Sequence, residues 1–410
     1  MTERRTITKL FAERYQRATK KEKGELLKEY LKLTDYDRCY GAWLLRSHGK
    51  RVALDPQRVA EGDVGKRVKR QSEPFYDNAV KTALVKVWMI LDCICGKRLA
   101  PIIKEIVIKL EACGELRLKA SVREKLITIS AATIDRLLVS EREKMGVRKV
   151  GHTKPGTLLK HQIPVRTFAD WNEQEPGFVE IDLVGHEGGN ASGDFCFTLD
   201  VTDVHSGWTE TRAVRNKARV WVVEALDKLA LGLPFTLKGV DSDNGSEFIN
   251  DHLYSYCVER HLTFTRARSG RKNDNCYVEQ KNYSVVRRAV GYARYETEEQ
   301  LRLLNELYEH LRLYTNYFQP VMKLLEKKRE GSKVSKKYDQ ARTPYQRLLD
   351  APQLSKEQKQ RLRREYAKIN PAQLKREITC LQEELLKSAC RQTKLNSRQA
   401  KPAQQTSAPR

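Results

Sequence analysis

The spacing of apolar residues predicts two helical blocks in the first third of the chain. Apolar residues recur at helical intervals over 19–33 and again over about 36–45, with cap and turn residues between the two segments. A second set of helical periods covers about 77–95, 101–112, 122–128 and 131–143. Short helices joined by a tight turn are compatible with a helix-turn-helix in each block, although many small helical domains share this pattern.

In the second block, the turn at Ile129 and Ser130 has the spacing of a helix-turn-helix. Ser130 is the predicted N-cap, and Thr133 and Arg136 are predicted on the exposed face of a recognition helix, where they would contact DNA. Between the blocks, residues 50–75 contain Gly62, Gly65, Pro74 and the basic run Lys-Arg-Val-Lys-Arg (66–70). They are interpreted either as a basic linker lying along phosphates or as plain disorder.

The middle of the chain changes to short β-rich runs. Strands are predicted at 178–184, 194–202, 209–214, 236–240 and 262–265. Helices are predicted at 218–231, 246–259 and 276–293. This βββαβαβα order predicts a mixed sheet flanked by helices, as in the ribonuclease-H type of α/β fold.

The last part of the chain returns to helical periodicity. The sequence predicts a helix at 298–314, a small basic β module at 331–348, helices over 352–390 and a disordered end. The predicted chain is therefore multidomain, with α-helical N-terminal helix-turn-helix domains, a central ribonuclease-H-like core, the β module and a helical C-terminal tail. The predicted boundaries are 1–75, 76–165, 166–295, 296–350 and 351–410.

Charge is distributed unevenly along the 410 residues. The 77 Lys and Arg exceed the 53 Asp and Glu, for a net charge of +24. Residues 1–169 carry +17 (37 basic, 20 acidic), 170–295 carry −4 (15 and 19) and 296–410 carry +11 (25 and 14). An acidic centre between two basic flanks fits a metal-binding core between segments that hold a nucleic acid.

Other features of the composition narrow the class of protein. No run of 18 apolar residues exists, so no membrane partner is expected. The first residues lack the apolar segment of a secretory signal. Nine cysteines, an odd number scattered along the chain, indicate free thiols in a reducing cytoplasm.

Three acidic residues occupy positions that favour chemistry. Asp182 lies inside the first predicted strand, where an uncompensated charge is costly. Asp243 follows the fourth strand, and strand ends are the usual place for a site in an α/β sheet. Glu279 lies one turn inside the helix that starts near residue 276. They can converge only if the first and fourth strands are neighbours and that helix packs over their ends.

Converging carboxylates repel one another unless cations neutralise them. Oxygen ligands select Mg²⁺ or Mn²⁺ over Zn²⁺. Two such ions about 4 Å apart can activate a hydroxyl and stabilise a leaving oxygen in phosphoryl transfer. The three acids therefore predict a two-ion site for Mg²⁺ or Mn²⁺.

The same residues resemble a known family. Asp243 follows Asp182 by sixty-one positions, and thirty-five residues separate it from Glu279. The segments Ser-Asp-Asn-Gly-Ser-Glu-Phe (242–248), Lys-Asn-Asp-Asn-Cys-Tyr-Val-Glu-Gln-Lys-Asn (272–282) and Leu-Asp-Val-Thr-Asp-Val-His-Ser-Gly (199–207) are similar too. Over about 170–295 the chain resembles DDE-type integrases and transposases, which include retroviral integrases and bacterial insertion-sequence transposases. The resemblance implies that the three acids are the metal ligands and that Asn282 faces DNA.

The resemblance also implies an activity, with one departure on the amino-terminal side. Such an enzyme would cleave element ends and join the 3′-hydroxyl to target DNA, as a homo-oligomer assembled on DNA in the nucleoid region of a bacterial cytoplasm. Retroviral integrases carry a His-His-Cys-Cys zinc module, whereas His48 is the only histidine before His152 here, so that module is absent. A nuclease of the same fold and a DNA-binding protein with a degenerate site remain alternatives.

Residues near the third acid are candidates for phosphate contact, with a solvated surface as the alternative. These basic residues are Arg271, Lys272, Lys281, Arg287 and Arg288. Four further residues are weaker candidates. Asp203 is interpreted as structural, Asp241 as a rival ligand, and His186 and His205 as surface residues rather than bases, because metal-activated water needs none.

Overall fold

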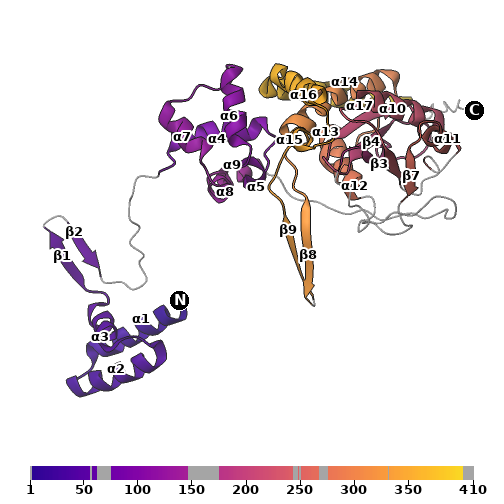
Figure 1. Cartoon of the computed structure of the whole chain (residues 1–410). Coiled ribbons are helices and arrows are strands. Elements are labelled where there is room, and N and C mark those ends of the chain that lie inside the picture. The colour runs from indigo at the N-terminus through magenta and orange to yellow at the C-terminus, as the bar shows by residue number, and fades with distance from the viewer. Residues whose placement is uncertain are drawn as a thin grey trace, which may run out of the picture. The chain divides into compact units, whose positions relative to one another are not determined.

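The computed structural model divides the chain into two compact units, Met1–Phe75 and Tyr76–Arg410 (Figure 1). The residues that the structure describes are 2–55, 58–61, 75–145, 175–242, 248, 251–266, 276–330 and 332–399.

The first unit holds three helices and a hairpin. They are α1 (Thr2–Arg17), α2 (Lys20–Thr34), α3 (Arg38–Ser47), β1 (Arg51–Asp55) and β2 (Arg58–Glu61). The helices bury a small core that includes Phe11, Tyr30 and Leu45. Thr19 and Glu22 form a capping box that starts α2. The predicted helices at 19–33 and 36–45 are confirmed.

The prediction of a linker from residue 50 onward is wrong for its first part. Strands β1 and β2 pair antiparallel, with Arg51 opposite Glu61. Each strand contains a valine, Val52 in β1 and Val59 in β2, and β-branched residues favour strands. The rest of the predicted linker, 62–74, lies outside the described residues.

The second unit begins with a block of six helices. They are α4 (Asn78–Ile90), α5 (Gly96–Leu99), α6 (Ile103–Ala112), α7 (Ala120–Ile127), α8 (Ala131–Leu137) and α9 (Val139–Lys144). Ser130 caps α8 as predicted, because its Oγ accepts the backbone N–H of Thr133 at 3.3 Å. The predicted helix over 131–143 is divided at Leu138, whose buried side chain packs into the core of the block.

A five-stranded mixed sheet forms the centre of the second unit. Its strands are β3 (Phe178–Gly185), β4 (Phe197–Asp203), β5 (Thr209–Val214), β6 (Gly239–Ser242) and β7 (Thr263–Arg266). They are arranged β5-β4-β3-β6-β7, with β3, β4 and β5 antiparallel and β6 and β7 parallel to β3. With α10 (Arg219–Gly232) after β5 and α11 (Asp251–Glu259) after β6, the βββαβαβα order is confirmed. The strands β3 and β6, which are the first and fourth of the sheet in chain order, are neighbours. This is the arrangement that the convergence of the three candidate acids requires.

The two faces of this sheet differ in chemistry. Alternate residues of a strand point to opposite faces. One face carries buried apolar residues, namely Val179, Ile181, Leu199, Val201 and Val240. The other carries acidic and hydroxyl residues, namely Glu180, Asp182, Thr198, Asp200, Thr202 and Asp241. Most of this polar face is buried, so its groups need partners from the helices above it.

The helical segment above the polar face is not a uniform α-helix. It comprises α12 (Cys276–Lys281), a π-helical segment η2 (Asn282–Arg287) and α13 (Arg288–Val290). The sequence predicts one helix over 276–293. A π-turn inserts extra backbone into a helix and is frequent at functional sites. Here it lies directly after Glu279 and Lys281.

The carboxyl-terminal part consists of four helices and a ribbon of two strands. The helices are α14 (Glu298–Phe318), α15 (Pro344–Asp350), α16 (Lys356–Lys368) and α17 (Pro371–Gln399). The ribbon, β8 (Leu324–Glu330) and β9 (Lys333–Tyr338), projects from the body of the unit (Figure 1).

Two predictions for this part need correction. The basic β module was expected at 331–348, but its first strand starts at Leu324 and residues 344–350 are helical, since Thr343 caps a helix with Pro344 at its first turn. The disordered end was expected from about 391, but α17 runs to Gln399. Residues 400–410 lie outside the described residues.

In the described part of the chain, no helix has both the length and the apolar character needed to cross a membrane. Every cysteine whose side chain is described is a free thiol, which is what the scattered spacing predicts.

A buried histidine beside the sheet should make stability depend on pH. His186 pairs through Nε2 with Thr198 Oγ1 at 2.7 Å, and burial, aided by the charge of Arg287, lowers its pKa to about 3. The unfolded chain binds this proton at about pH 6.5, so folding stability is lost as pH falls below that value. We expect a loss of about 2 kcal/mol between pH 6.5 and 5 from this residue.

Urea unfolding of wild type and His186→Gln at several pH values measures this loss. The variant should show a shallower decline over that interval. The matched control is His261→Asn, at an exposed turn position, which should keep the wild-type slope. Equal slopes for wild type and His186→Gln would contradict the prediction.

Candidate catalytic site

Glu180 joins the sheet to the start of α12. This residue of β3 is fully buried, and its Oε2 accepts the backbone N–H groups of Tyr277 at 2.8 Å and Val278 at 2.9 Å. A carboxylate at a helix N-terminus satisfies donors that have no partner within the helix. Burial, opposed by these hydrogen bonds and aided by the charges of Asp241 and Glu279, raises the pKa of Glu180 well above its usual range.

Asp182 joins the same strand to the other end of that helical turn. Its Oδ2 accepts the side-chain amide of Asn282 at 2.6 Å, and its Oδ1 accepts the N–H of Leu183 at 2.8 Å. Glu279 lies between the two attachments and is exposed. The structure therefore holds Glu279 on a segment bonded to β3 on both sides, beside the strand that carries Asp182.

The third predicted ligand, Asp243, lies outside the described residues. It follows Ser242, the last residue of β6, and Ser242 pairs with Ile181 of β3. The chain thus leaves β6 at the level of Asp182. Among the described residues, no three His, Cys, Asp or Glu side chains are grouped so that they could hold a metal ion.

Asp200 and Lys281 form a buried charge network near Asp182 that the sequence did not reveal. Asp200 lies directly opposite Asp182 in the pairing of β3 with β4 and is fully buried, with its Oδ1 accepting the hydroxyl of Thr202 at 3.1 Å. Lys281, also buried, supplies the opposite charge. Burial raises the pKa of Asp200 and lowers that of Lys281. A charged residue inside a strand was the signal that identified Asp182, and Asp200 carries the same signal.

The rival acids have structural partners. Asp203 accepts the N–H of Gly177 at 2.9 Å and of Ser206 at 2.6 Å, which confirms the structural interpretation. Asp241 is buried beside Glu180 in the parallel pairing and accepts the hydroxyl of Thr265. Asp203 thus holds the backbone at Gly177 and Ser206, on either side of β3 and β4, and Asp241 links β6 to β7.

The predicted phosphate-binding residues fall into three groups. Arg271 and Lys272 lie outside the described residues. Arg287 donates to the carbonyl of Gly185 at 2.8 Å and Arg288 to the carboxylate of Asp92 at 2.6 Å, so each has an internal partner. Lys281 is buried rather than on a solvated surface.

The remaining DNA-contact predictions are not tested by the structure. Thr133 is half-buried and Arg136 exposed on α8, with the guanidinium of Arg136 donating to the Thr133 hydroxyl at 3.0 Å. Asn282 is turned toward Asp182. His186 is buried beside Thr198, which corrects its interpretation as a surface residue.

The oxygen atoms on the polar face of the sheet are of the type that binds Mg²⁺ or Mn²⁺. The polar face carries more carboxylate than ammonium: it holds Glu180, Asp182, Asp200 and Asp241, and the charge of the buried Lys281 acts on Asp200. In the described structure, Glu180 Oε1 and Asp200 Oδ2 are buried without a hydrogen-bond partner. Excess buried negative charge of this kind is relieved by a bound cation.

Comparison with known proteins identifies one clear relative. No protein-family model matches the chain. The uncharacterized protein y4rM of Sinorhizobium fredii is 39% identical over 338 residues, which cover 82% of this chain and 93% of y4rM.

Two solved structures are similar at a much lower level. The catalytic core of BIV integrase shares 16% identity with a TM-score of 0.29, covering 42% of this chain and 93% of that core. The catalytic core of HTLV-2 integrase shares 12% identity with a TM-score of 0.28, covering 36% and 90%. This likeness is too low to assign an activity.

Proposed function

We propose that this chain, which belongs to the same family as the Sinorhizobium fredii protein y4rM, is a DNA transposase or integrase. It would cleave the ends of a DNA element and join the freed 3′-hydroxyl to target DNA. One observation carries the proposal: Glu180 and Asn282 attach the segment that bears Glu279 to the strand that bears Asp182. Together with the strand pairing that ends β6 beside them, this arrangement supports a carboxylate centre for phosphoryl transfer.

Asp182, Asp243 and Glu279 would hold the divalent cations, Mg²⁺ or Mn²⁺. When bound, two such ions activate a hydroxyl and stabilise a leaving oxygen. The other residues of the network hold these ligands in place. Glu180 fixes the start of α12, and Asn282 orients one oxygen of Asp182. Such supporting hydrogen bonds keep ligands in their productive orientation.

The β8–β9 ribbon supports DNA as the partner. Residues 324–338 include six basic and two acidic residues. Lys327 lies directly opposite Lys336 in the antiparallel register, and like charges placed opposite each other destabilise a sheet. A two-stranded ribbon fits a groove of duplex DNA, whose phosphates would relieve this repulsion.

Removing the like-charge pair should therefore weaken binding to duplex DNA. We expect the double variant Lys327→Ser/Lys336→Ser to reduce the slope of log K against log salt by about 2, because each lost phosphate contact removes about 0.9. Its thermal stability should not fall, since the repulsion is removed as well. Salt titrations of binding to a labelled duplex measure the slope. A pair of lysines replaced elsewhere, Lys356→Ser/Lys359→Ser on α16, is the matched control, and equal slopes in both variants would contradict the assignment.

The decisive test of the function is a joining assay. Purified protein receives DNA that carries the element ends, already cut to expose a 3′-hydroxyl, together with target DNA and Mg²⁺ or Mn²⁺. Joined product is the expected result. Cutting of intact ends without joining would instead indicate a nuclease of the same fold, and binding without either reaction would indicate a degenerate site.

A further inference from the structure

A cationic hollow lies beside the helix that carries Glu279. It has a volume of about 690 Å³, and its walls come from α5, α12 to α13, α14, α17 and the base of the ribbon. Its charged lining consists of Asp92, Arg98, Lys281, Arg288 and Lys375. Four cations therefore face one carboxylate.

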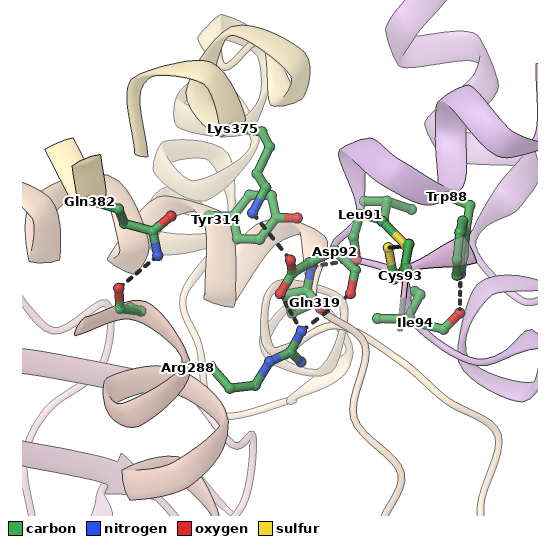
Figure 2. A network of polar contacts seen from close by, with 12 residues as sticks. Trp88, Leu91, Asp92, Cys93, Ile94, Arg288, Tyr314, Gln319, Lys375 and Gln382 are labelled. Atoms are coloured by element: carbon green, nitrogen blue, oxygen red, sulfur yellow. Dashed lines mark hydrogen bonds and ion pairs between the residues drawn. The ribbon is translucent and has the colours of Figure 1, made fainter. Parts of the chain in front are cut away.

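The single carboxylate is already shared. Asp92 binds Arg288 Nη2 through Oδ2 at 2.6 Å and Lys375 Nζ through Oδ1 at 3.2 Å, as Figure 2 shows. Its backbone has a φ of 61°, a left-handed conformation that costs energy for a residue other than glycine. These bonds hold two of the four cations at the wall of the hollow.

The other two cations are Arg98 and Lys281. Arg98 uses its Nε to bind the carbonyl of Pro320 at 2.5 Å. Lys281 is 8% exposed and is one of the residues that line the hollow. Arg98 repels both Lys281 and Arg288. The charge of Asp200, which does not line the hollow, attracts Lys281. Within the hollow, however, four cations share the carboxylate of Asp92, and this excess of positive charge suits an anionic ligand.

A second hollow of about 450 Å³ continues from the first toward the ribbon. Both are lined by Gln280, Lys281 and Tyr338, and the second adds Lys323 and Lys336 against Glu326. Tyr338 is 45% exposed. Gln280 follows Glu279 directly, so the two hollows lead from the candidate catalytic helix to the base of β9.

We propose that the two hollows form one groove that binds a single strand of DNA. Arg98 and Lys281 would contact its phosphates, and the ring of Tyr338 would stack on a base. Cations along a groove together with an exposed aromatic ring are the features that single-strand binding uses. The inference rests on the proposed function, because it assigns this groove to the strand adjoining the one that reacts.

Binding of a labelled oligonucleotide of mixed sequence to the full chain, without divalent ions, tests the groove. We expect Lys281→Gln to weaken binding about tenfold and to reduce the salt slope by about 0.7, the contribution of one phosphate on a single strand. Tyr338→Ala should weaken binding about tenfold as well, whereas Tyr338→Phe should bind like wild type because it keeps the ring. Lys228→Gln, which removes an exposed charge on α10, is the control for net charge.

Specific outcomes overturn the proposal. It is wrong if Lys281→Gln binds no worse than Lys228→Gln while Tyr338→Ala binds like wild type. It is also wrong if both groove variants weaken a blunt duplex as much as the single strand. Because Tyr338 is partly exposed, its variants test the groove even if Lys281→Gln fails to fold. If wild type joins DNA but the groove variants bind the oligonucleotide as wild type does, the groove is rejected and the proposed function stands. If the groove variants bind the oligonucleotide more weakly but wild type does not join DNA, the proposed function is rejected and the groove stands.

Discussion

Replacing Glu279 with Gln should lower the rate of DNA joining by about 10³-fold or more while binding of element ends persists. The amide keeps the shape of the side chain but loses the negative charge that would hold a divalent cation. Glu279 is exposed, and the bonds that place its helix come from Glu180 and Asn282, so the variant should fold like wild type. Joining of pre-cut ends and end binding are measured side by side.

A matched variant separates this effect from a general loss of charge. Glu259→Gln makes the same chemical change at an exposed position at the end of α11 and should join DNA at the wild-type rate. Full joining activity in Glu279→Gln would reject the assignment of this carboxylate. Loss of end binding together with joining would instead show that Glu279 acts in holding DNA.

Replacing Arg312 with Leu should destabilise the second unit by about 3–5 kcal/mol, because it leaves a buried carboxylate without its counter-charge. The guanidinium of Arg312 on α14 binds Glu210 of β5 at 2.9 Å and Glu365 of α16 at 3.1 Å. Glu210 is buried and also accepts the indole N–H of Trp208 at 2.7 Å. Three elements are joined through this one side chain, so its loss affects all of them.

Denaturant unfolding measures this effect, and the same helix supplies the control. Arg302 forms an exposed ion pair with Glu306 one turn away, and Arg302→Leu should cost less than about 1 kcal/mol. The double variant Arg312→Leu/Glu210→Gln should recover much of the lost stability, since the amide still accepts the Trp208 N–H without burying a charge. Equal effects of the two Arg variants would show that the buried pair contributes no more than a surface pair.

Local sequence determined most of the elements. The alternation over 178–184 and the helical period over 218–231 gave β3 and α10 to within about a residue or two of their ends. Ser130 was identified as a cap because its hydroxyl needs only the next turn of backbone. Errors came where local patterns were ambiguous, as at 331–348, where a lysine-rich strand is followed a few residues later by a capped helix.

The candidate site was only partly visible in the sequence. Asp182 was found because a charge inside a strand demands compensation. The partners that compensate it come from elsewhere in the chain: Asn282 lies one hundred residues away, and Asp200 became a neighbour only through the pairing of β3 with β4. Lys281 was expected at the surface, yet the packing of α12 on the sheet buries it.

The sequence by itself determined the order of strands and helices, the acidic centre between basic flanks and the three candidate acids. Each depends on composition or on contacts within a few residues. Only the tertiary structure decided that Glu180 and Asn282 hold the helix of Glu279 to the sheet, and that Arg98 and Lys281 share one hollow. These relations join residues 97 to 183 positions apart, and burial and charge compensation at that separation arise from packing that no local pattern encodes.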